Sequence, residues 1–304
     1  MNPKSQIFGK NGIMRSALLT VGLILALNLS GFAGRAQNLT APLPDIRQLM
    51  KEVQDHQRQL DKVREAYTYT SLHTIQDIDP AGRVKKTDTE EDEDFFVNGH
   101  IIERTVKKNG KPLEGHDLEK EAARVTKLVE KAEKTAPGQP LEGPSVSVGR
   151  LLEIMEVRNE RREMYKGRPT IVFDFVGRKD AKTHGIVEDA SKKLEGTIWI
   201  DEGDRQVAHL QVRFIDNFHV VGGIFANIQK GSNFSFEQSV VNPPGNGGAA
   251  ADALWLPVGG EGAMAARVLL VKNMRQRYLE RDYDYKRFSV ETQQAKDAKV
   301  AEKK

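Results

Sequence analysis

The segment 194-LEGTIWID-201 and the stretch 205-RQVAHLQVRF-214 that follows it carry the strongest structural pattern in this sequence. Ile198 and Ile200 lie two positions apart, and apolar residues again take every second position in the next stretch. Such alternation is typical of a strand with one packed face and one more polar face. Trp199 lies between the two isoleucines and therefore faces the opposite side. Two such strands joined by a short turn predict an antiparallel hairpin.

The same period of two continues from Arg168 to Phe288 and predicts that nearly all of this half is strand. Its alternating apolar residues are Ile171, Phe173, Phe175, Ile198, Ile200, Ala208, Leu210, Val212, Phe214, Phe234, Phe236, Val240, Met264, Ala266, Val268 and Leu270. No strand–helix–strand rhythm accompanies them, so a parallel sheet is not expected. With the N-terminal hairpins included, we predict an α+β fold: an antiparallel sheet of about nine to eleven strands with about three helices.

The N-terminal half adds the helices and the first strands. Asp45 can cap a helix with an apolar stripe at three- and four-residue spacing. The turn sequence Asp79-Pro80-Ala81-Gly82 predicts a hairpin of residues 66–78 and 83–91. The expected helices cover residues 45–65, 117–134 and the segment from Ser145 or Ser147 to about Arg162.

The first 36 residues have the layout of a secretory signal peptide. Three basic residues and no acidic one precede the uncharged apolar run Ala17–Leu29, and small residues at 34 and 36 favour cleavage before Gln37. A start at Met14 would give a shorter leader of the same kind. An uncleaved anchor is the alternative, but a spanning helix needs about 20 apolar residues, and Ser30 ends this run. We therefore predict a periplasmic or secreted protein without a stable membrane span after cleavage.

Charge and cysteine content exclude several classes of function. The chain has 46 basic and 43 acidic residues, and four of the basic ones lie in the predicted leader, which leaves 42 against 43. A nucleic-acid partner is therefore not expected. The chain has no Cys, so disulfides, thiol catalysis and thiolate metal sites are excluded. We divide the sequence into a signal peptide (1–36), one domain (37–290) with a helical insert near 111–165, and a charged tail (291–304).

No motif indicates an enzyme. No serine lies in a G-x-S-x-G elbow, and no two histidines have the i, i+4 spacing of a helical metal site. His209 and His219 lie on neighbouring predicted strands, where isolated histidines more often have packing roles. The acidic run Asp88–Asp94 lacks the internal glycine of a calcium loop, and we interpret it as a solvated strand end that discourages edge pairing. We expect no catalytic residues, no metal and no cofactor.

Two passages are similar to a known family. The segment Leu194–Asp201 with its following strand resembles the G-x-x-W-I-D hairpin of the LolA-like superfamily, whose members carry lipoproteins and lipids in the periplasm. Ala253–Pro257, with the strands on either side of it, resembles the closing strands of secreted relatives. The order of leader, long helix and Tyr-rich hairpin also matches. The resemblance covers most of residues 44–288.

This resemblance implies a strongly curved, open half-barrel with helices against its concave side. Relatives hold acyl chains or other lipids there without a cofactor, and apolar area alone can supply that affinity. We therefore hypothesise an exported binding protein for a lipid, a lipoprotein acyl chain or another hydrophobic ligand, held between the sheet and the helix at 45–65. The candidate cavity residues are Ile198, Ile200, Leu210, Val212, Phe214, Phe234 and Phe236.

Two other hypotheses stay open. In the first, the same scaffold is an envelope sensor or protein-interaction module that uses the 111–165 insert and the acidic run to contact an envelope protein. In the second, it is a hydrolase whose polar site forms only in three dimensions. Perturbed carboxylates and a histidine in one cleft would support that second hypothesis.

Overall fold

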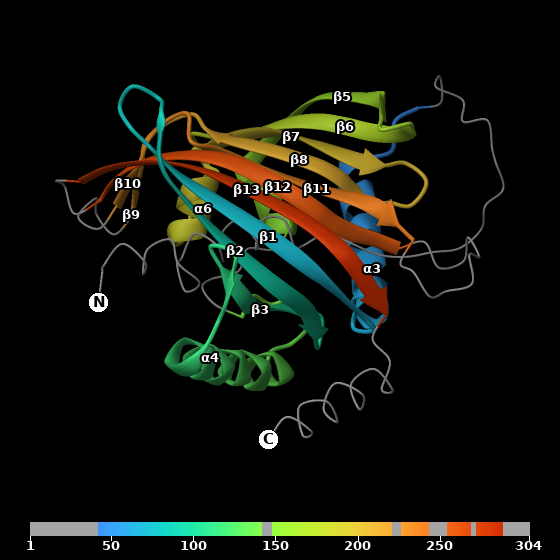
Figure 1. Cartoon of the computed structure of the whole chain (residues 1–304). Coiled ribbons are helices and arrows are strands. Elements are labelled where there is room, and N and C mark those ends of the chain that lie inside the picture. Colours follow the sequence, from blue (N-terminus) through green and yellow to red (C-terminus); the bar gives the residue numbers. More distant parts are fainter. Residues whose placement is uncertain (1–41, 142–147, 221–225, 243–253, 269–271, 288–304) are drawn as a thin grey trace.

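The computed structural model describes residues 42–141, 148–220, 226–242, 254–268 and 272–287 (Figure 1). The predicted signal peptide and the charged tail lie outside these residues. The described helices are α3 (Ile46–Arg64), α4 (Gly115–Lys134), α5 (Val148–Ile154) and α6 (Ile186–Ser191). The described strands are β1 (Tyr67–Ile78), β2 (Val84–Val97), β3 (His100–Lys108), β4 (Lys111–Pro112), β5 (Met155–Tyr165), β6 (Arg168–Gly177), β7 (Leu194–Asp201), β8 (Val207–Phe214), β9 (Phe218–Val220), β10 (Ala226–Ile228), β11 (Asn233–Val241), β12 (Leu254–Val268) and β13 (Lys272–Arg287).

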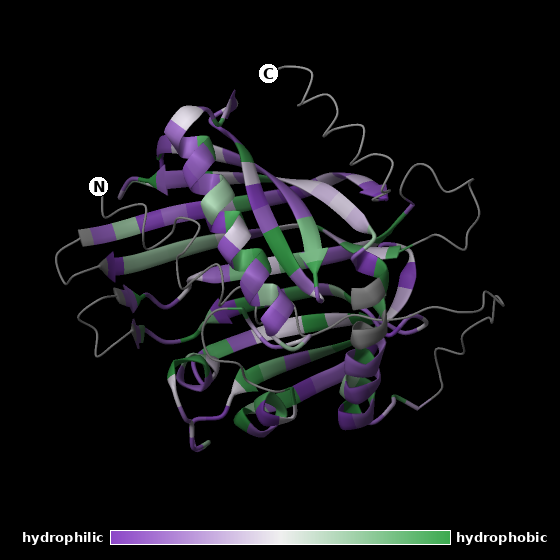
Figure 2. Cartoon of the chain, turned by 90° about the horizontal axis from the view of Figure 1, so that it is seen from below, coloured by the Kyte–Doolittle hydropathy of each residue, from purple (hydrophilic) through white to green (hydrophobic). Residues whose placement is uncertain are grey.

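One antiparallel sheet contains all 13 described strands, in the order β4-β3-β2-β1-β13-β12-β11-β8-β7-β6-β5, with β9 and β10 attached beside β12. The sheet is open, since β4 and β5 form two separate edges. The described helices lie beneath it, on the side that we call the inner face (Figures 1 and 2). The predicted α+β class and antiparallel sheet are therefore confirmed, with more strands and one more helix than expected.

The first helix forms as predicted, whereas the third is shorter. Asp45 accepts a hydrogen bond from the backbone N–H of Gln48 (2.9 Å) and so caps α3. We expected a helix to about Arg162, but α5 ends at Ile154 and β5 begins at the next residue. The reason is that β5 pairs along β6 through a tight turn at Lys166-Gly167, where both residues have positive φ angles (48° and 80°). The 111–165 insert therefore contains both helix and strand, and α6 was not predicted.

Both edges of the sheet are blocked against further strand pairing. At β3, side chains of α4 satisfy the backbone: Thr105 N–H donates to Glu121 Oε1 (2.7 Å), and Arg124 donates to the Glu103 carbonyl. β4 covers only the end of β3 and contains a proline. At the other edge, β5 is rich in charge, and its pairing with β6 is irregular at Asn159, which has a positive φ of 52°. Charge and irregularity protect such edges.

The two passages that resemble the family meet in space. The Asp201 carboxylate accepts hydrogen bonds from the backbone N–H groups of Gly203 (3.0 Å) and Asp204 (2.7 Å) and closes the turn between β7 and β8. Arg168 donates to the same carboxylate from β6 (2.5 Å). Asp204 in turn accepts a hydrogen bond from Trp255 Nε1 of β12 (2.8 Å). The W-I-D segment therefore builds a turn that fixes the start of β12.

Gly196 is required by close contact between strands. A Cβ atom at this position would lie 2.2 Å from the Gln211 carbonyl oxygen and 2.5 Å from Phe175 Cζ. We expect Gly196→Ala to lower the free energy of unfolding by about 1–3 kcal/mol, because strand backbone cannot shift without breaking its pairing. Urea unfolding of the purified protein measures this change.

Gly149→Ala in α5 is the matched control, since a Cβ atom added there would have no atom within 4 Å. We expect it to leave stability unchanged or to raise it by up to about 1 kcal/mol. A Gly196→Ala variant as stable as the wild type would show that β7 and β8 are less closely packed than these distances indicate.

Candidate functional site

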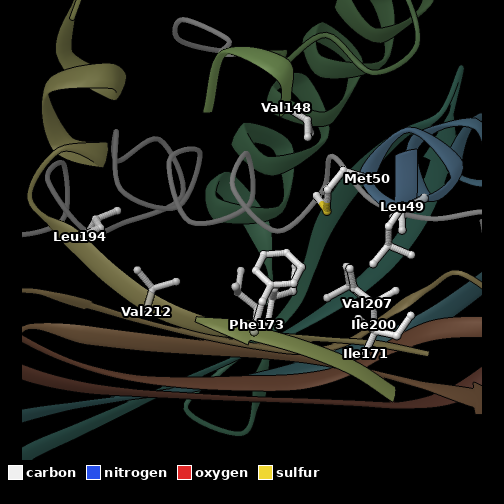
Figure 3. Packing of buried hydrophobic residues seen from close by; sticks show 12 residues of the cluster. Leu49, Met50, Val148, Ile171, Phe173, Leu194, Ile200, Val207 and Val212 are labelled. Carbon is white, nitrogen blue, oxygen red and sulfur yellow. The ribbon is translucent and has the colours of Figure 1, made fainter. Parts of the chain in front are cut away.

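Helices α3 and α5 cover the apolar half of the inner face (Figure 3). Residues from these two helices face residues of β6, β7 and β8, and all are at most 6% exposed. The cluster consists of Leu49, Met50, Val53, Val148, Ile171, Phe173, Leu194, Ile198, Ile200, Val207, Leu210 and Val212. It is the larger of two buried apolar clusters in the described part of the chain.

The structure places the seven predicted cavity residues on this one inner face. Ile198, Ile200, Leu210 and Val212 are buried in the cluster, and Phe214 and Phe234 pack against it. Phe236 is directly opposite Leu210 on the neighbouring strand and is half-buried, outside the cluster. The predicted phase of the strands was correct. Contact with a ligand stays a prediction, because the described contacts of these residues are with the protein's own side chains.

Polar contacts fasten α3 over the apolar half. Glu52 forms an ion pair with Arg205 in the β7–β8 turn (2.8 Å), and His56 Nδ1 lies 3.2 Å from a carbonyl oxygen of the same turn. At the end of the helix, the buried Arg64 guanidinium donates to the Trp255 carbonyl (3.1 Å). The helix is thus held at one turn and at one strand end, with apolar contacts between them.

Trp199 and His209 lie on the outer face of the sheet. Their rings are 4.9 Å apart, and Tyr165 stacks on His209 at 5.3 Å. Burial lowers the pKa of His209. We predicted correctly that Trp199 faces away from the isoleucines, and the rings of Tyr165 and His209 pack against it there. His219 lies on β9, which pairs with β10, so the structure does not bring the two histidines together on adjacent strands.

The strands on the other side of the inner face carry buried polar and acidic residues next to the second apolar cluster, which includes Tyr69, Phe96 and Tyr285. Asp282, Ser71, Asp92 and Thr105 lie directly opposite one another across β13, β1, β2 and β3, and each is 8% exposed or less. Asp94 follows Asp92 on the same side of β2 and is 3% exposed. Residues that oppose each other in an antiparallel sheet point to the same face. We call these five residues the acid patch.

A single hydroxyl group joins two carboxyl groups of the acid patch. Ser71 Oγ lies within hydrogen-bond distance of Asp94 Oδ2 and 2.8 Å from Asp282 Oδ1. A hydroxyl has one hydrogen, so it can donate to only one of them and must accept from the other. One carboxyl group is therefore protonated. In agreement, burial and the nearby Glu103 raise the pKa of Asp94, and burial and Glu280 raise the pKa of Asp282 to about 7.

A second polar chain lies beside the acid patch. His73, which is 2% exposed, has Nε2 3.2 Å from Asp92 Oδ2 and Nδ1 2.6 Å from the Tyr278 hydroxyl. The Tyr278 hydroxyl donates to Glu280 Oε2 (2.5 Å), so His73 Nδ1 carries a hydrogen and donates to Tyr278. Asp92, His73, Tyr278 and Glu280 are thus connected in sequence along the inner face.

The acidic run Asp88–Asp94 does not form the solvated strand end that we predicted. It belongs to β2, which is paired on both sides, by β1 and β3. Glu91 faces outward and pairs with Lys107 (2.6 Å), whereas Asp92 and Asp94 face inward and are buried. The sequence could not show which of these residues face inward. Acidic residues occupy consecutive positions of the strand, so they lie on both faces and the pattern favours neither.

The acid patch does not have the arrangement of a metal site or a hydrolytic pair. Among the residues described, no three His, Asp or Glu side chains are grouped so as to hold a metal ion. Ser71 contacts two carboxyl groups rather than His73, so serine and histidine do not form a nucleophile–base pair. What the patch offers is buried acceptor oxygen atoms and exchangeable protons.

Neither a protein-family model nor a curated protein sequence matches the chain. The chain has a structural similarity to a domain from Vibrio parahaemolyticus that is described as an outer membrane lipoprotein-sorting protein domain. That match has 12% identity and a TM-score of 0.31, over 75% of this chain and 89% of that one. A DUF1329 family protein from Desulfovibrio piger matches at 8% identity and a TM-score of 0.30, over 77% and 90% of the two chains.

A further similarity is to the MucA/MucB complex of Pseudomonas aeruginosa, at 8% identity and a TM-score of 0.23, over 73% of this chain and 91% of that one. None of the described helices combines the length and apolar character needed to cross a bilayer. Because these structural likenesses are weak, the function is inferred below from this chain's own residues.

The acid patch predicts an unusual pH dependence of stability. The pKa of Asp282 is about 7 in the folded protein, against an ordinary value of 3.8, so the folded state binds more protons between these pH values. The contribution of Asp282 to the free energy of unfolding therefore falls as pH rises from about 4 to 7. We expect Asp282→Asn, which stays neutral and can still accept from Ser71, to be about 2–4 kcal/mol more stable than wild type at pH 8, and the difference to disappear near pH 4.

Urea unfolding at pH 4, 6 and 8 tests this expectation. Glu91→Gln, on the outer face of β2, serves as the control and should follow the wild-type profile. Parallel profiles for wild type and Asp282→Asn would contradict the raised pKa.

Proposed function

We propose that this protein is an exported binding protein for the apolar part of a lipid, a lipoprotein acyl chain or another hydrophobic ligand. The binding region is the apolar half of the inner face, and α3 is the element that a ligand displaces or lifts. The observation that supports this most directly is that a continuous apolar surface of three strands is covered by α3, which has polar attachments, together with the short helix α5. No catalytic step is assigned to the protein.

The energies of the exchange are comparable. Leu49, Met50 and Val53 of α3 are buried on the cluster, and such side chains contribute about 1.5–3 kcal/mol each. A buried methylene contributes about 0.8 kcal/mol, so about six to eleven methylenes of an acyl chain match these three side chains. A hydrophobic ligand can therefore replace the helix contacts without a large net cost, which is what reversible carriage requires.

The structure removes one of the two surfaces on which the protein-interaction hypothesis relied. It placed a partner on the acidic run, yet Asp92 and Asp94 of that run are buried and Glu91 is paired with Lys107. The run therefore presents no continuous acidic surface. The α4 region remains the surface that this alternative would use.

Native mass spectrometry tests the proposed function. The protein is purified from its own cell envelope without detergent, and retained molecules are extracted into organic solvent. We expect a discrete adduct that is identified as a lipid or an acylated peptide. A bare mass that stays bare after incubation with phospholipid vesicles would contradict lipid carriage and favour the interaction module.

Restraint of α3 gives a second test, made simple by the absence of cysteine. In the double variant Glu52→Cys and Arg205→Cys, the two positions of the 2.8 Å ion pair are joined by a thiol-reactive crosslinker with a cleavable disulfide. We expect the tethered protein to bind a fluorescent fatty-acid probe at least about tenfold more weakly, since α3 cannot move. Reduction of the crosslinker should restore binding.

The control tether lies within α3. Lys51 and Asp55 form an exposed i, i+4 ion pair (2.5 Å), so a crosslink between cysteines at these positions leaves the helix free to move. This control should bind the probe like wild type. Equal probe binding by the Glu52–Arg205 protein before and after reduction would contradict movement of α3.

A further inference from the structure

Strand β13 separates its charged residues by sign between the two faces of the sheet. Its side chains alternate in exposure from Asn273 to Tyr283, as expected for a strand with one covered and one open face. The inward positions include Glu280 and Asp282, whereas no outward position is acidic. The outward side chains, all exposed, are Asn273, Arg275, Arg277, Leu279, Arg281 and Tyr283. The outer face of this strand is therefore basic.

The two neighbouring strands extend this basic surface and barely neutralise it. The residues directly opposite the outward positions are Arg267, Ala265, Ala263, Glu261 and Gly259 on β12, and Gln76, Thr74, Leu72 and Thr70 on β1. In these rows Glu261 is the one acidic residue, and Arg267 adds a fourth exposed arginine. We call Arg267, Arg275, Arg277, Leu279, Arg281 and Tyr283 the arginine face.

The four arginines of this face form no ion pair in the part of the chain that the structure describes. The hydrogen bonds that they make go to neutral groups: Arg275 donates to the Pro80 carbonyl oxygen (3.3 Å), and Arg267 donates to Asn273 Oδ1 (3.3 Å). Acidic partners across the ladder are the usual arrangement in a sheet. Other strands have them on the outer face, in the pairs Lys107–Glu91, Arg104–Glu93 and Arg213–Glu195. The positive charge of the central strands is thus left for an external partner.

The arginine face lies at the centre of an open surface. In the sheet order, β13 has four strands on one side and six on the other, and the described helices lie on the opposite, inner side (Figures 1 and 2). A sheet that arches over its helices meets a flat partner along its central strands. Arg275 and Arg281 are six residues apart, which is about 20 Å along a strand. The basic row can therefore contact a flat, extended partner along its whole length.

Apolar side chains lie between the arginines. Leu279 is 38% exposed and Tyr283 is 42% exposed, and they are two of the six exposed large hydrophobic residues in the described part of the chain. Together with Arg277 and Arg281 they occupy four successive outward positions of β13. A soluble polyanion would contact the charges alone. A bilayer surface contacts both kinds of side chain, because tyrosine and leucine enter the headgroup layer while basic groups bind lipid phosphates.

We propose that the arginine face docks the protein on the surface of an anionic phospholipid bilayer. This inference goes beyond the proposed function and does not rest on it, because the apolar half lies on the opposite face of the sheet. The guanidinium groups donate charge-assisted hydrogen bonds to lipid phosphates, and Leu279 and Tyr283 enter the headgroup layer. Docking in this orientation leaves α3 and the inner face toward the aqueous phase, where a ligand can be exchanged.

Vesicle flotation with the full protein from the envelope tests this proposal. The probes are vesicles of phosphatidylcholine alone and of phosphatidylcholine mixed with phosphatidylglycerol. We expect at least about tenfold tighter binding to the anionic vesicles, since each basic residue near such a surface strengthens binding about fivefold. Salt at about 0.5 M shortens the screening length to about 4 Å and should remove the preference. Equal affinity for the two vesicles at low salt would overturn the proposal.

Variants locate the docking surface. Arg277→Gln with Arg281→Gln should weaken binding to the anionic vesicles about tenfold or more, whereas Arg277→Lys with Arg281→Lys keeps the charge and should retain most of the binding. The matched control, Lys127→Gln with Lys131→Gln, removes two exposed charges from α4 on the inner side and should bind like wild type. Equal losses in the two glutamine variants would indicate an effect of net charge alone and overturn the arginine face.

A tryptophan reporter distinguishes a bilayer from a soluble polyanion. In Tyr283→Trp, the indole emission should shift to shorter wavelength on anionic vesicles and be quenched by phospholipids brominated in the upper acyl chain, with wild type as the background. Vesicle binding without quenching, or binding to heparin without a preference for anionic vesicles, would overturn bilayer docking. The Arg277→Gln and Arg281→Gln protein should bind the fluorescent fatty-acid probe like wild type, so failure of docking leaves lipid carriage standing.

Discussion

The Asp201 carboxylate is the contact on which the inner face depends. It neutralises Arg168, accepts two backbone N–H groups of its own turn and is 1% exposed. The turn that it closes presents Arg205 to α3 and Asp204 to Trp255. One buried carboxylate thus sets the position of the covering helix and of the strand that separates the apolar half from the acid patch. Removal of Arg168 would leave the buried Asp201 carboxylate without its cationic partner, which costs more than the pair itself contributes.

The two halves of the inner face are stabilised differently: one by apolar packing, the other by hydrogen bonds among buried carboxyl groups. Apolar side chains fill the side toward β6, and the side toward β3 combines aromatic side chains with carboxyl groups bridged by a hydroxyl. The polar side lowers the cost of buried charge because a hydroxyl can bridge two carboxyl groups only if one of them is neutral. The acid patch therefore carries less charge beside a hydrophobic cluster than its carboxyl groups could, and it gains charge as the pH rises through the raised pKa of Asp282. The sheet therefore joins an apolar surface to a polar one whose charge depends on pH.

The sequence predicted the elements with strong periodicity and missed the features that depend on distant pairing. Ile198 and Ile200 indicated the correct face, because strand alternation is a local property. The segment after Ile154 was assigned to a helix as the continuation of the apolar residues Leu151, Leu152 and Ile154, and only pairing with β6 makes it a strand. Ser71 and Asp282 are 211 positions apart, so no local pattern could reveal their contact. Apolar cavity residues and ordinary core residues also have the same composition, so periodicity identifies the face and not its use.

The blocked edges of the sheet have a consequence for the protein's behaviour at high concentration. Open sheets can recruit a strand from another molecule, and this protein has no disulfide to hold its edges in place. Glu121 and Arg124 occupy the backbone groups of β3 as a neighbouring strand would, although they belong to a helix. Two side chains of α4 therefore form hydrogen bonds with β3 backbone groups that an added strand would otherwise pair with. At this edge, resistance to strand addition thus depends on two side chains of one helix, outside the apolar cluster beneath α3.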